Sequence, residues 1–120
     1  MSAPQTQDDC LFCQIVTGSI PNDTVVETER VLAFRDIQPQ APTHVLVIPK
    51  DHHATLAAVA VDDPQLASEL LAVVPQVASA EGLEVDGYRV VANTGTHGQQ
   101  TVHHVHLHVL GGRQLQWPPG

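Results

Sequence analysis

The segment HHVHLHVLGG, residues 103–112, constrains the fold of this chain more than any other feature. It places four of the chain's eight histidines within six positions, and apolar residues alternate with them. Because successive side chains on a β-strand point to opposite faces, this period of two predicts a strand with an apolar core-facing side. His104, His106 and His108 would share the other face. Three consecutive imidazoles are more than a solvated polar face needs, so this strand is predicted to carry chemistry.

Length and charge limit the classes of protein and partner. A chain of 120 residues with 42% hydrophobic and 15% charged residues is one globular domain that can bury its own core. The net charge is −8, and only five residues are Lys or Arg. Phosphate backbones and anionic lipids are bound by clustered basic residues, so neither nucleic acid nor a membrane is an expected partner. A small anionic ligand needs only one local site and stays compatible with this composition.

The N-terminal segment MSAPQTQDD has neither the basic nor the apolar region of a secretory signal. No apolar stretch approaches the ~20 residues that a membrane span requires. Together with two cysteines that are too close to staple a fold, these features predict a reducing, cytoplasmic location. We expect residues 1–8 to form a flexible tail and residues 9–120 a single domain, with a C-terminal tail at 111–120.

Periodicity and turn signals predict an α+β fold with the order helix, three strands, helix, two strands. The longest helix would start at a cap on Asp62 or Asp63, with Pro64 in its first position, and stop near Gly82. Pro75 is expected to kink this helix or end its first half. Hairpin-length connections favour antiparallel pairing. The other predicted elements are a helix from residue 11 to near Gly18, a hairpin turning at 29–30, and strands at 44–49, 88–93 and 102–110.

Two kinds of chemistry suit the histidine strand. Imidazoles two residues apart can bind one metal ion, although no carboxylate lies in or beside this strand. Alternatively, one neutral imidazole acts as a nucleophile while its neighbours stabilise developing charge. The preceding loop NTGTHGQQT offers glycines and neutral donors of the kind that cradle phosphates, which favours the second interpretation.

A second candidate site is the pair Cys10 and Cys13. Cys-x-x-Cys spacing lets two thiolates bind one tetrahedral Zn²⁺, with two further ligands needed. The segment DHH at 51–53 is a source of histidine ligands. A reduced, empty thiol pair is the alternative, whereas a redox motif is disfavoured because no thioredoxin-like βαβ pattern surrounds it.

The run from His104 to Leu110 has the pattern His-φ-His-φ-His-φ-φ, in which φ is apolar, and it resembles the signature of the histidine triad superfamily. GGRQLQWPPG and LAFRDIQPQAPTHVLVIPK are similar to marked segments of the histidine triad nucleotide-binding (Hint) branch. The resemblance spans residues 9 to 120. It implies a HIT-like antiparallel sheet of about five strands with two helices, continued across a homodimer. It also implies hydrolysis of purine nucleoside phosphoramidates containing AMP or GMP, with no cofactor required for catalysis.

The same resemblance assigns roles to individual residues. His106 would be the nucleophile, while His104 and His44 would orient it or relay protons. Asp36 would accept hydrogen bonds from both ribose hydroxyls, a task that suits two carboxylate oxygens. Trp117 would reach the partner subunit's site. The remaining positions are the phosphate contacts His108, Gln100 and Thr101, the ribose or phosphate contact Asn93, and the base-pocket residues Phe34, Ile37, Ile20 and Leu46.

Some bacterial relatives of this kind hold structural zinc, which by resemblance assigns the ligands Cys10, Cys13, His52 and His104 here. The chain departs from the branch at Gln99, where a glycine is common, and at His97 and His103, which we interpret as surface residues. Three rivals to a phosphoramidase remain. A dinucleoside polyphosphate hydrolase is disfavoured by the WPPG tail, a non-catalytic nucleotide-binding adaptor by the intact middle histidine, and a metalloenzyme by the missing carboxylate.

Overall fold

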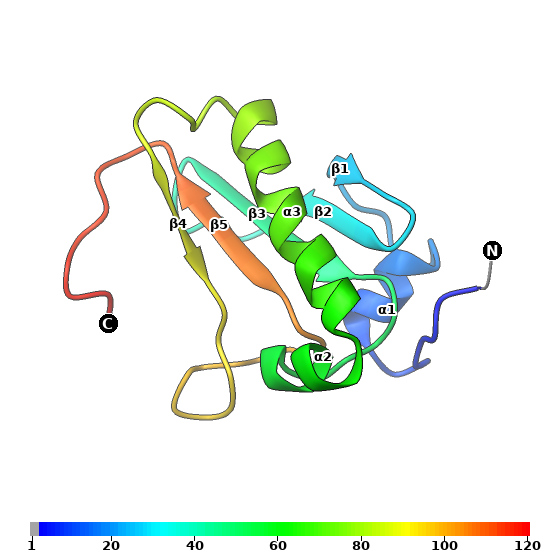
Figure 1. Cartoon of the computed structure of the whole chain (residues 1–120). Coiled ribbons are helices and arrows are strands. Elements are labelled where there is room, and N and C mark those ends of the chain that lie inside the picture. The colour runs from blue at the N-terminus through cyan, green and yellow to red at the C-terminus, as the bar shows by residue number, and fades with distance from the viewer. Residues whose placement is uncertain (1–2) are drawn as a thin grey trace.

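Near-continuous apolar runs in the central strands β2 and β3 give this protein a sheet with two buried faces. The computed structural model describes residues 3–120, and its five strands form one antiparallel sheet in the order β1-β2-β3-β5-β4 (Figure 1). The predicted α+β class and five-stranded antiparallel sheet are therefore confirmed. The strands are β1 (Thr24–Glu27), β2 (Val31–Arg35), β3 (Thr43–Pro49), β4 (Tyr88–Val91) and β5 (Leu107–Gly111).

One face of the sheet packs against α3 (Pro64–Ala80), which crosses the strands in Figure 1. Leu66, Leu70 and Val77 from this helix are almost fully buried. They belong to one apolar cluster with the odd-numbered residues of the central strands, among them Val45, Val47 and Val109. Burying a side chain of this size contributes about 1.5–3 kcal/mol, so this cluster is the main core.

The opposite face packs against α1 (Leu11–Val16). Here Phe12, Cys13 and Ile15 are buried together with the even-numbered strand residues Leu32, Phe34, Leu46 and Ile48. In β5, His108 is directly opposite Leu46 of β3. The histidine side of β5 therefore lies on the same face of the sheet as α1, where His108 is half-buried.

The middle of the chain holds two helices where the sequence predicted one. Helix α2 (Leu56–Asp62) precedes α3, and Thr55 and Asp63 cap the two N-termini. The Thr55 hydroxyl accepts from Ala58 N–H, and the Asp63 carboxylate accepts from Leu66 N–H. Three helices therefore replace the predicted two. Helix α2 was not predicted because its seven residues are too few to show a clear apolar period.

Pro75 does not divide α3, which continues as one element to Ala80. A proline inside a helix removes one hydrogen bond and crowds the preceding turn. The buried residues Val74, Val77 and Ala78 flank it and pack on the sheet, which offsets that loss. The helix ends as predicted, with Glu81 as its cap and Gly82 at a φ of 70°.

The final strand is shorter than predicted. It begins at Leu107, whereas the sequence analysis placed its start at residue 102. Val105 N–H donates instead to the carbonyl of His53, 2.7 Å away, so residues 102–106 follow the loop after β3 and not the sheet. The predicted strand at 88–93 likewise ends at Val91.

Residues 1–2 of the predicted N-terminal tail lie outside the described residues. Farther along, Gln5 bonds to the loop after β3: its N–H donates to Asp51 Oδ1 at 2.8 Å, and its carbonyl accepts from His52 N–H. The C-terminal tail leaves the sheet beside β4, on the side away from the N-terminus (Figure 1). Among residues 3–120, no helix is both long enough and apolar enough to span a membrane.

Candidate active site and metal centre

His106 lies in the extended segment just before β5, with its side chain almost fully buried. Its ring Nδ1 is 2.8 Å from the carbonyl oxygen of His104. A carbonyl only accepts, so Nδ1 carries the proton and donates, and the neutral ring keeps its lone pair on Nε2. Burial is the main cause that lowers the pKa of His106 below its usual 6.5. Among the described residues, Nε2 has no hydrogen-bond partner, so it is the ring atom free to react.

His108 and His44 form a pair beside His106. The His106 and His108 ring centroids are 4.9 Å apart. His108 Nδ1 is 2.8 Å from His44 Nε2. Burial is the main cause that lowers the pKa of His108 to about 4, and the nearby rings of His106 and His44 lower it further. Burial also lowers the pKa of His44. Both rings are therefore neutral at pH 7.

Asp36 follows β2 and is placed beside His44 by sheet pairing. Its N–H donates to the His44 carbonyl at 2.9 Å. One carboxylate oxygen, Oδ1, accepts from Gln38 N–H at 2.8 Å, and Oδ2 is 3.5 Å from His44 Nε2. This geometry fixes the carboxylate while Oδ2 keeps capacity to accept further hydrogen bonds.

The loop at 94–100 is held in shape by the buried Gln100. Its amide donates to the carbonyls of Ala54 and Val102, at 2.7 and 3.1 Å, and its Oε1 accepts from Gly95 N–H. Both of its amide hydrogens are thus used inside the protein. In this conformation the Gln100 side chain shapes the loop, whereas Thr101 is exposed and Asn93 is half-buried beside it.

Backbone geometry explains two positions in this loop. A Cβ on Gly98 would lie 2.6 Å from the Thr94 carbonyl oxygen, so only glycine fits there. Gln99 has a φ of 60°, and it is the one non-glycine residue with positive φ in the described chain. Side chains other than glycine are disfavoured in this left-handed region. The departure noted at residue 99 therefore falls where the backbone itself favours glycine.

The four predicted base-pocket residues do not all come together. Phe34 and Leu46 are buried in the α1-side cluster, and Ile20 packs against it. Ile37 is 95% exposed. Trp117 in the C-terminal tail is 79% exposed, and its ring centroid lies 5.8 Å from the Arg89 guanidinium. His97 and His103 are exposed, as predicted.

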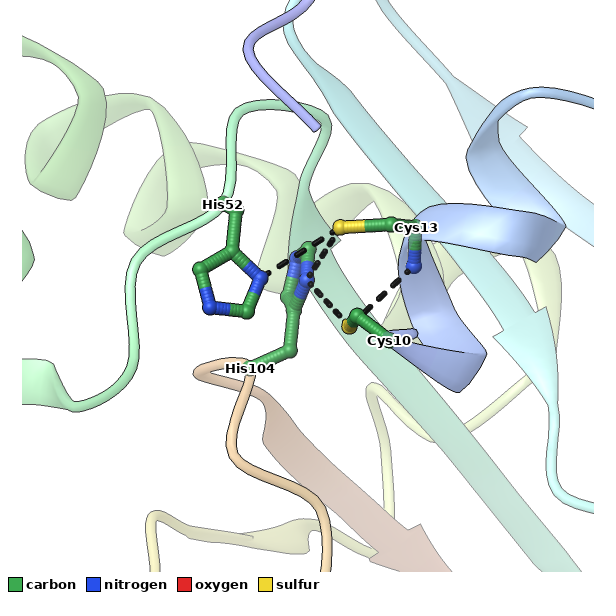
Figure 2. Close-up of side chains that lie close together, drawn as sticks. All are labelled: Cys10, Cys13, His52 and His104. Carbon is green, nitrogen blue, oxygen red and sulfur yellow. Dashed lines mark hydrogen bonds between the residues drawn. The ribbon is translucent and has the colours of Figure 1, made fainter. Parts of the chain in front are cut away.

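The second site joins α1 to two distant loops (Figure 2). Cys10 is the N-cap residue of α1 and Cys13 lies within that helix, whereas His52 comes from the loop after β3 and His104 from the segment before β5. Their donor atoms all lie within 4.8 Å of one another. Cys10 Sγ is 3.4 Å from His104 Nδ1, and Cys13 Sγ lies 3.3 and 3.5 Å from the Nδ1 atoms of His52 and His104.

These separations fit a tetrahedral zinc ion. With Zn–S bonds of about 2.3 Å and Zn–N bonds of about 2.0 Å, sulfur and nitrogen ligands are about 3.5 Å apart. His104 Nε2 donates to the Pro49 carbonyl at 2.8 Å, which leaves the Nδ1 lone pair facing the thiols. The residues present therefore have the chemistry, the spacing and the orientation of a Cys₂His₂ site.

Burial disfavours the charged forms of Cys13, His52 and His104. It raises the pKa of Cys13 to about 11 and lowers that of His104 to about 4, and it lowers the pKa of His52. Without a cation, the Cys13 thiol stays protonated and the two imidazoles stay neutral. A bound divalent ion would stabilise the thiolates and reverse this preference.

Three groups that orient these sites were not predicted from the sequence. The Pro49 carbonyl orients His104, and Gln40 N–H donates to His44 Nδ1 at 3.0 Å. Both act through the backbone, which leaves no signal in residue types. The third is Phe12, whose ring meets those of His106 and His104 edge-on at centroid distances of 5.1 and 5.9 Å. Its position between the two cysteines was the available signal.

Comparison with known proteins identifies the family. The HIT domain family matches residues 17–115. The chain belongs to the HIT domain family. It is 50% identical over 113 residues to an uncharacterized HIT-like protein of Synechococcus elongatus, covering 94% of this chain and 98% of that one. It is 53% identical over 112 residues to a 14 kDa zinc-binding protein of Zea mays, covering 92% and 87%.

Solved structures of this HIT family share the fold. A HIT family hydrolase from Legionella pneumophila superimposes with a TM-score of 0.89 at 54% sequence identity. The match covers 93% of this chain and 100% of that one.

Proposed function

We propose that this HIT-family protein is a purine nucleoside phosphoramidase of the Hint branch, with His106 as its covalent nucleophile. The observation that carries the proposal is the Nδ1–H of His106 donated to the His104 carbonyl, because it leaves Nε2 as a free nucleophilic nitrogen. An imidazole held in one tautomer and one orientation loses little freedom on reaching the transition state.

The reaction proceeds in two balanced steps. His106 Nε2 forms a bond to the α-phosphorus while the P–N bond breaks, and the amine leaves with one proton taken up from solvent. Water then attacks the nucleotidyl-histidine, the P–N bond to His106 breaks, the water gives one proton back to solvent, and a nucleoside monophosphate is released. The net reaction consumes one water and needs neither a metal nor an oxidant.

The surrounding residues suit a nucleotide. Asp36 has a carboxylate oxygen available for ribose hydroxyls, and His108 lies next to the attacking ring. Phe34, Leu46 and Ile20 offer an apolar wall for the purine. Asn93, Thr101 and the N–H groups of the 94–100 loop contact the ribose and phosphates, while Gln100 holds that loop in place.

We further propose that Cys10, Cys13, His52 and His104 bind one structural zinc ion. The related Zea mays protein is described as zinc-binding, and the donor spacing here fits the ion. The zinc would stabilise the fold between α1 and the two loops. His106 does not belong to this ligand set and remains available for attack.

We propose that the protein is a cytoplasmic homodimer whose sheet continues across the two subunits. Exposed Tyr88 and Val90 on the edge strand β4 favour such pairing. Trp117, exposed in one chain, would then contact the neighbouring site. No nucleic acid or membrane partner is proposed.

The test compares two substrates. We expect wild-type protein to hydrolyse a fluorogenic adenosine phosphoramidate much faster than a dinucleoside polyphosphate, before and after EDTA treatment. His106→Ala should abolish turnover, while His103→Ala, at an exposed histidine of the same segment, should retain it. Turnover that survives His106→Ala would contradict the proposal. Faster polyphosphate hydrolysis would favour the rival hydrolase, and tight nucleotide binding without turnover of either substrate would favour the adaptor.

A further inference from the structure

The ring of His44 is held in one tautomer by a backbone amide. Gln40 N–H donates to His44 Nδ1 at 3.0 Å. A backbone N–H can only donate, so Nδ1 must present a lone pair, and the neutral ring carries its proton on Nε2. The His44 side chain is buried, so no solvent-exposed alternative position is open to it.

The surroundings of His44 Nε2 agree with that proton. His108 Nδ1 lies 2.8 Å away, and an Asp36 carboxylate oxygen lies 3.5 Å away. Both atoms can accept. In the opposite tautomer, the Nδ1–H of His44 would point at the Gln40 N–H. The lone pair on His44 Nε2 would then face the Asp36 carboxylate oxygen. Both contacts would be repulsive.

The tautomer of His44 then determines the tautomer of His108. Because its Nδ1 accepts from His44 Nε2–H, a neutral His108 carries its proton on Nε2. Within residues 3–120, this Nε2 is buried and has no hydrogen-bond partner. A buried N–H without an acceptor is unusual in native proteins and marks a place where a bound group completes the hydrogen bond.

We propose that the backbone N–H of Gln40 is a positioning group which, through His44, fixes His108 as a hydrogen-bond donor at Nε2. That the acceptor is a phosphoryl oxygen of the substrate rests on the proposed function, but the order of protons does not. His106 has the opposite order, with Nδ1–H bound to the His104 carbonyl. Neighbouring rings 4.9 Å apart thus present one nucleophilic nitrogen and one donor.

The same chain of hydrogen bonds excludes a metal from a second cluster. Donor atoms of Asp36, His44 and His108 lie within 4.8 Å of one another, close enough to share an ion. A metal there would need a lone pair on His44 Nε2, the atom that Gln40 forces to carry a proton. His104 differs, because Pro49 takes its Nε2–H and frees Nδ1. We therefore expect one zinc ion per chain and not two.

The direct test is NMR of the full chain labelled with ¹⁵N. Histidine nitrogen shifts should show Nε2–H on both His44 and His108, and Nδ1–H on His106. Scalar couplings across N–H···N bonds should join Gln40 N to His44 Nδ1, and His44 Nε2 to His108 Nδ1. An Nδ1–H tautomer at His44 or His108, or loss of the Gln40 coupling, would overturn the proposal whether or not the protein cleaves phosphoramidates.

Variants at residue 44 separate positioning from packing. His44→Gln keeps an amide donor near the Nε2 position, whereas His44→Leu fills the space without one. We expect His108 to keep its single tautomer in His44→Gln and to lose it in His44→Leu. Phosphoramidate kcat should fall further in His44→Leu, by about 10²-fold, the usual effect of removing one donor to a developing charge. Equal His108 tautomers in the two variants would overturn the proposal.

Two readouts keep this proposal distinct from the proposed function. If tautomers and couplings are as expected but no phosphoramidate is cleaved, the proposed function fails and the positioning role of Gln40 stands. Zinc titration of wild-type protein should saturate at one ion, and Cys10→Ser/Cys13→Ser should bind none tightly. Tight binding by that double variant, lost again on Asp36→Asn, would contradict the assigned proton order.

Discussion

His106 Nδ1 donates to the carbonyl oxygen of His104, 2.8 Å away, and the His104 ring points its own Nδ1 at two cysteine sulfurs. One residue therefore contributes its backbone to the proposed nucleophile and its side chain to the proposed zinc site. Phe12, between the cysteines, contacts both rings. The two sites are therefore adjacent. A change at the metal ligands can affect His106 through the His104 carbonyl and through the Phe12 ring.

Removing the zinc ligands should lower stability without removing the nucleophile. Zinc that binds only the folded chain adds stability, and this gain grows with its free concentration. We expect Cys13→Ser to abolish stoichiometric zinc in metal analysis and to lower the melting temperature measured by calorimetry. The melting temperatures of wild type and Cys13→Ser should converge once EDTA is present. A wild-type melting temperature that does not respond to EDTA would argue against a structural ion.

Buried histidines should make stability fall in weak acid. Burial, then the neighbouring imidazoles, lower the pKa of His108 from 6.5 to about 4, and burial lowers the pKa of His44. Above pH 6.5 neither the folded nor the unfolded chain is protonated at these rings. Between pH 6.5 and about 4 the unfolded chain binds protons that the folded chain does not, so stability decreases as pH falls.

The measurement is thermal unfolding of metal-free protein from pH 8 to pH 4. His108→Gln should reduce the slope of melting temperature against pH, whereas His103→Gln, at an exposed position, should leave it unchanged. Equal slopes in wild type and His108→Gln would refute the assigned burial effect.

The left-handed backbone at residue 99 offers a stabilising substitution. Gln99 has a φ of 60°, where a Cβ is disfavoured and glycine is not. We expect Gln99→Gly to raise the free energy of unfolding by about 0.5–1 kcal/mol, after allowing for glycine's greater freedom in the unfolded chain. Gln99→Ala keeps the Cβ and serves as the control, with little change expected. Chemical denaturation measures both, and a less stable glycine variant would be inconsistent with this explanation.

The role of Asp36 should appear in substrate affinity. Asp36→Asn keeps an acceptor for Gln38 N–H but removes the negative charge that would bind ribose hydroxyls. A hydrogen bond to a charged group contributes about 1.5–3 kcal/mol, so affinity for a nucleoside monophosphate should fall about 10- to 100-fold. Asp62→Asn, at an exposed carboxylate near the end of α2, is the matched control. Calorimetric titration compares them, and unchanged affinity in Asp36→Asn would assign the ribose contact elsewhere.

Periodicity and capping residues predicted most of this fold because they act locally. β-Branched residues and segment length predicted β3, Pro64 marked the start of α3, and Gly82 marked its end. The resemblance to histidine triad proteins also assigned the metal ligands Cys10, Cys13, His52 and His104, which the structure brings together. The start of β5 was predicted wrongly because Val105 bonds to the carbonyl of His53, a tertiary contact with no signature in the period of two.

What escaped the sequence analysis acts through the backbone or through burial. The Gln40 amide and the Pro49 carbonyl set the order of protons on His44 and His104, and any residue type supplies such groups. Exposure of Ile37 follows from the turn after Asp36, where Gln38 N–H binds the carboxylate. The family resemblance had assigned that side chain to the base pocket.

The central claim, covalent catalysis by His106, is tested most directly by trapping the intermediate. Wild-type protein would be mixed with an adenosine phosphoramidate, quenched within the first turnover, and digested for peptide mass spectrometry. The account predicts a single adenylyl group on His106, absent from the His106→Ala variant. Turnover with no adduct, or an adduct on His108 or His104, would contradict it.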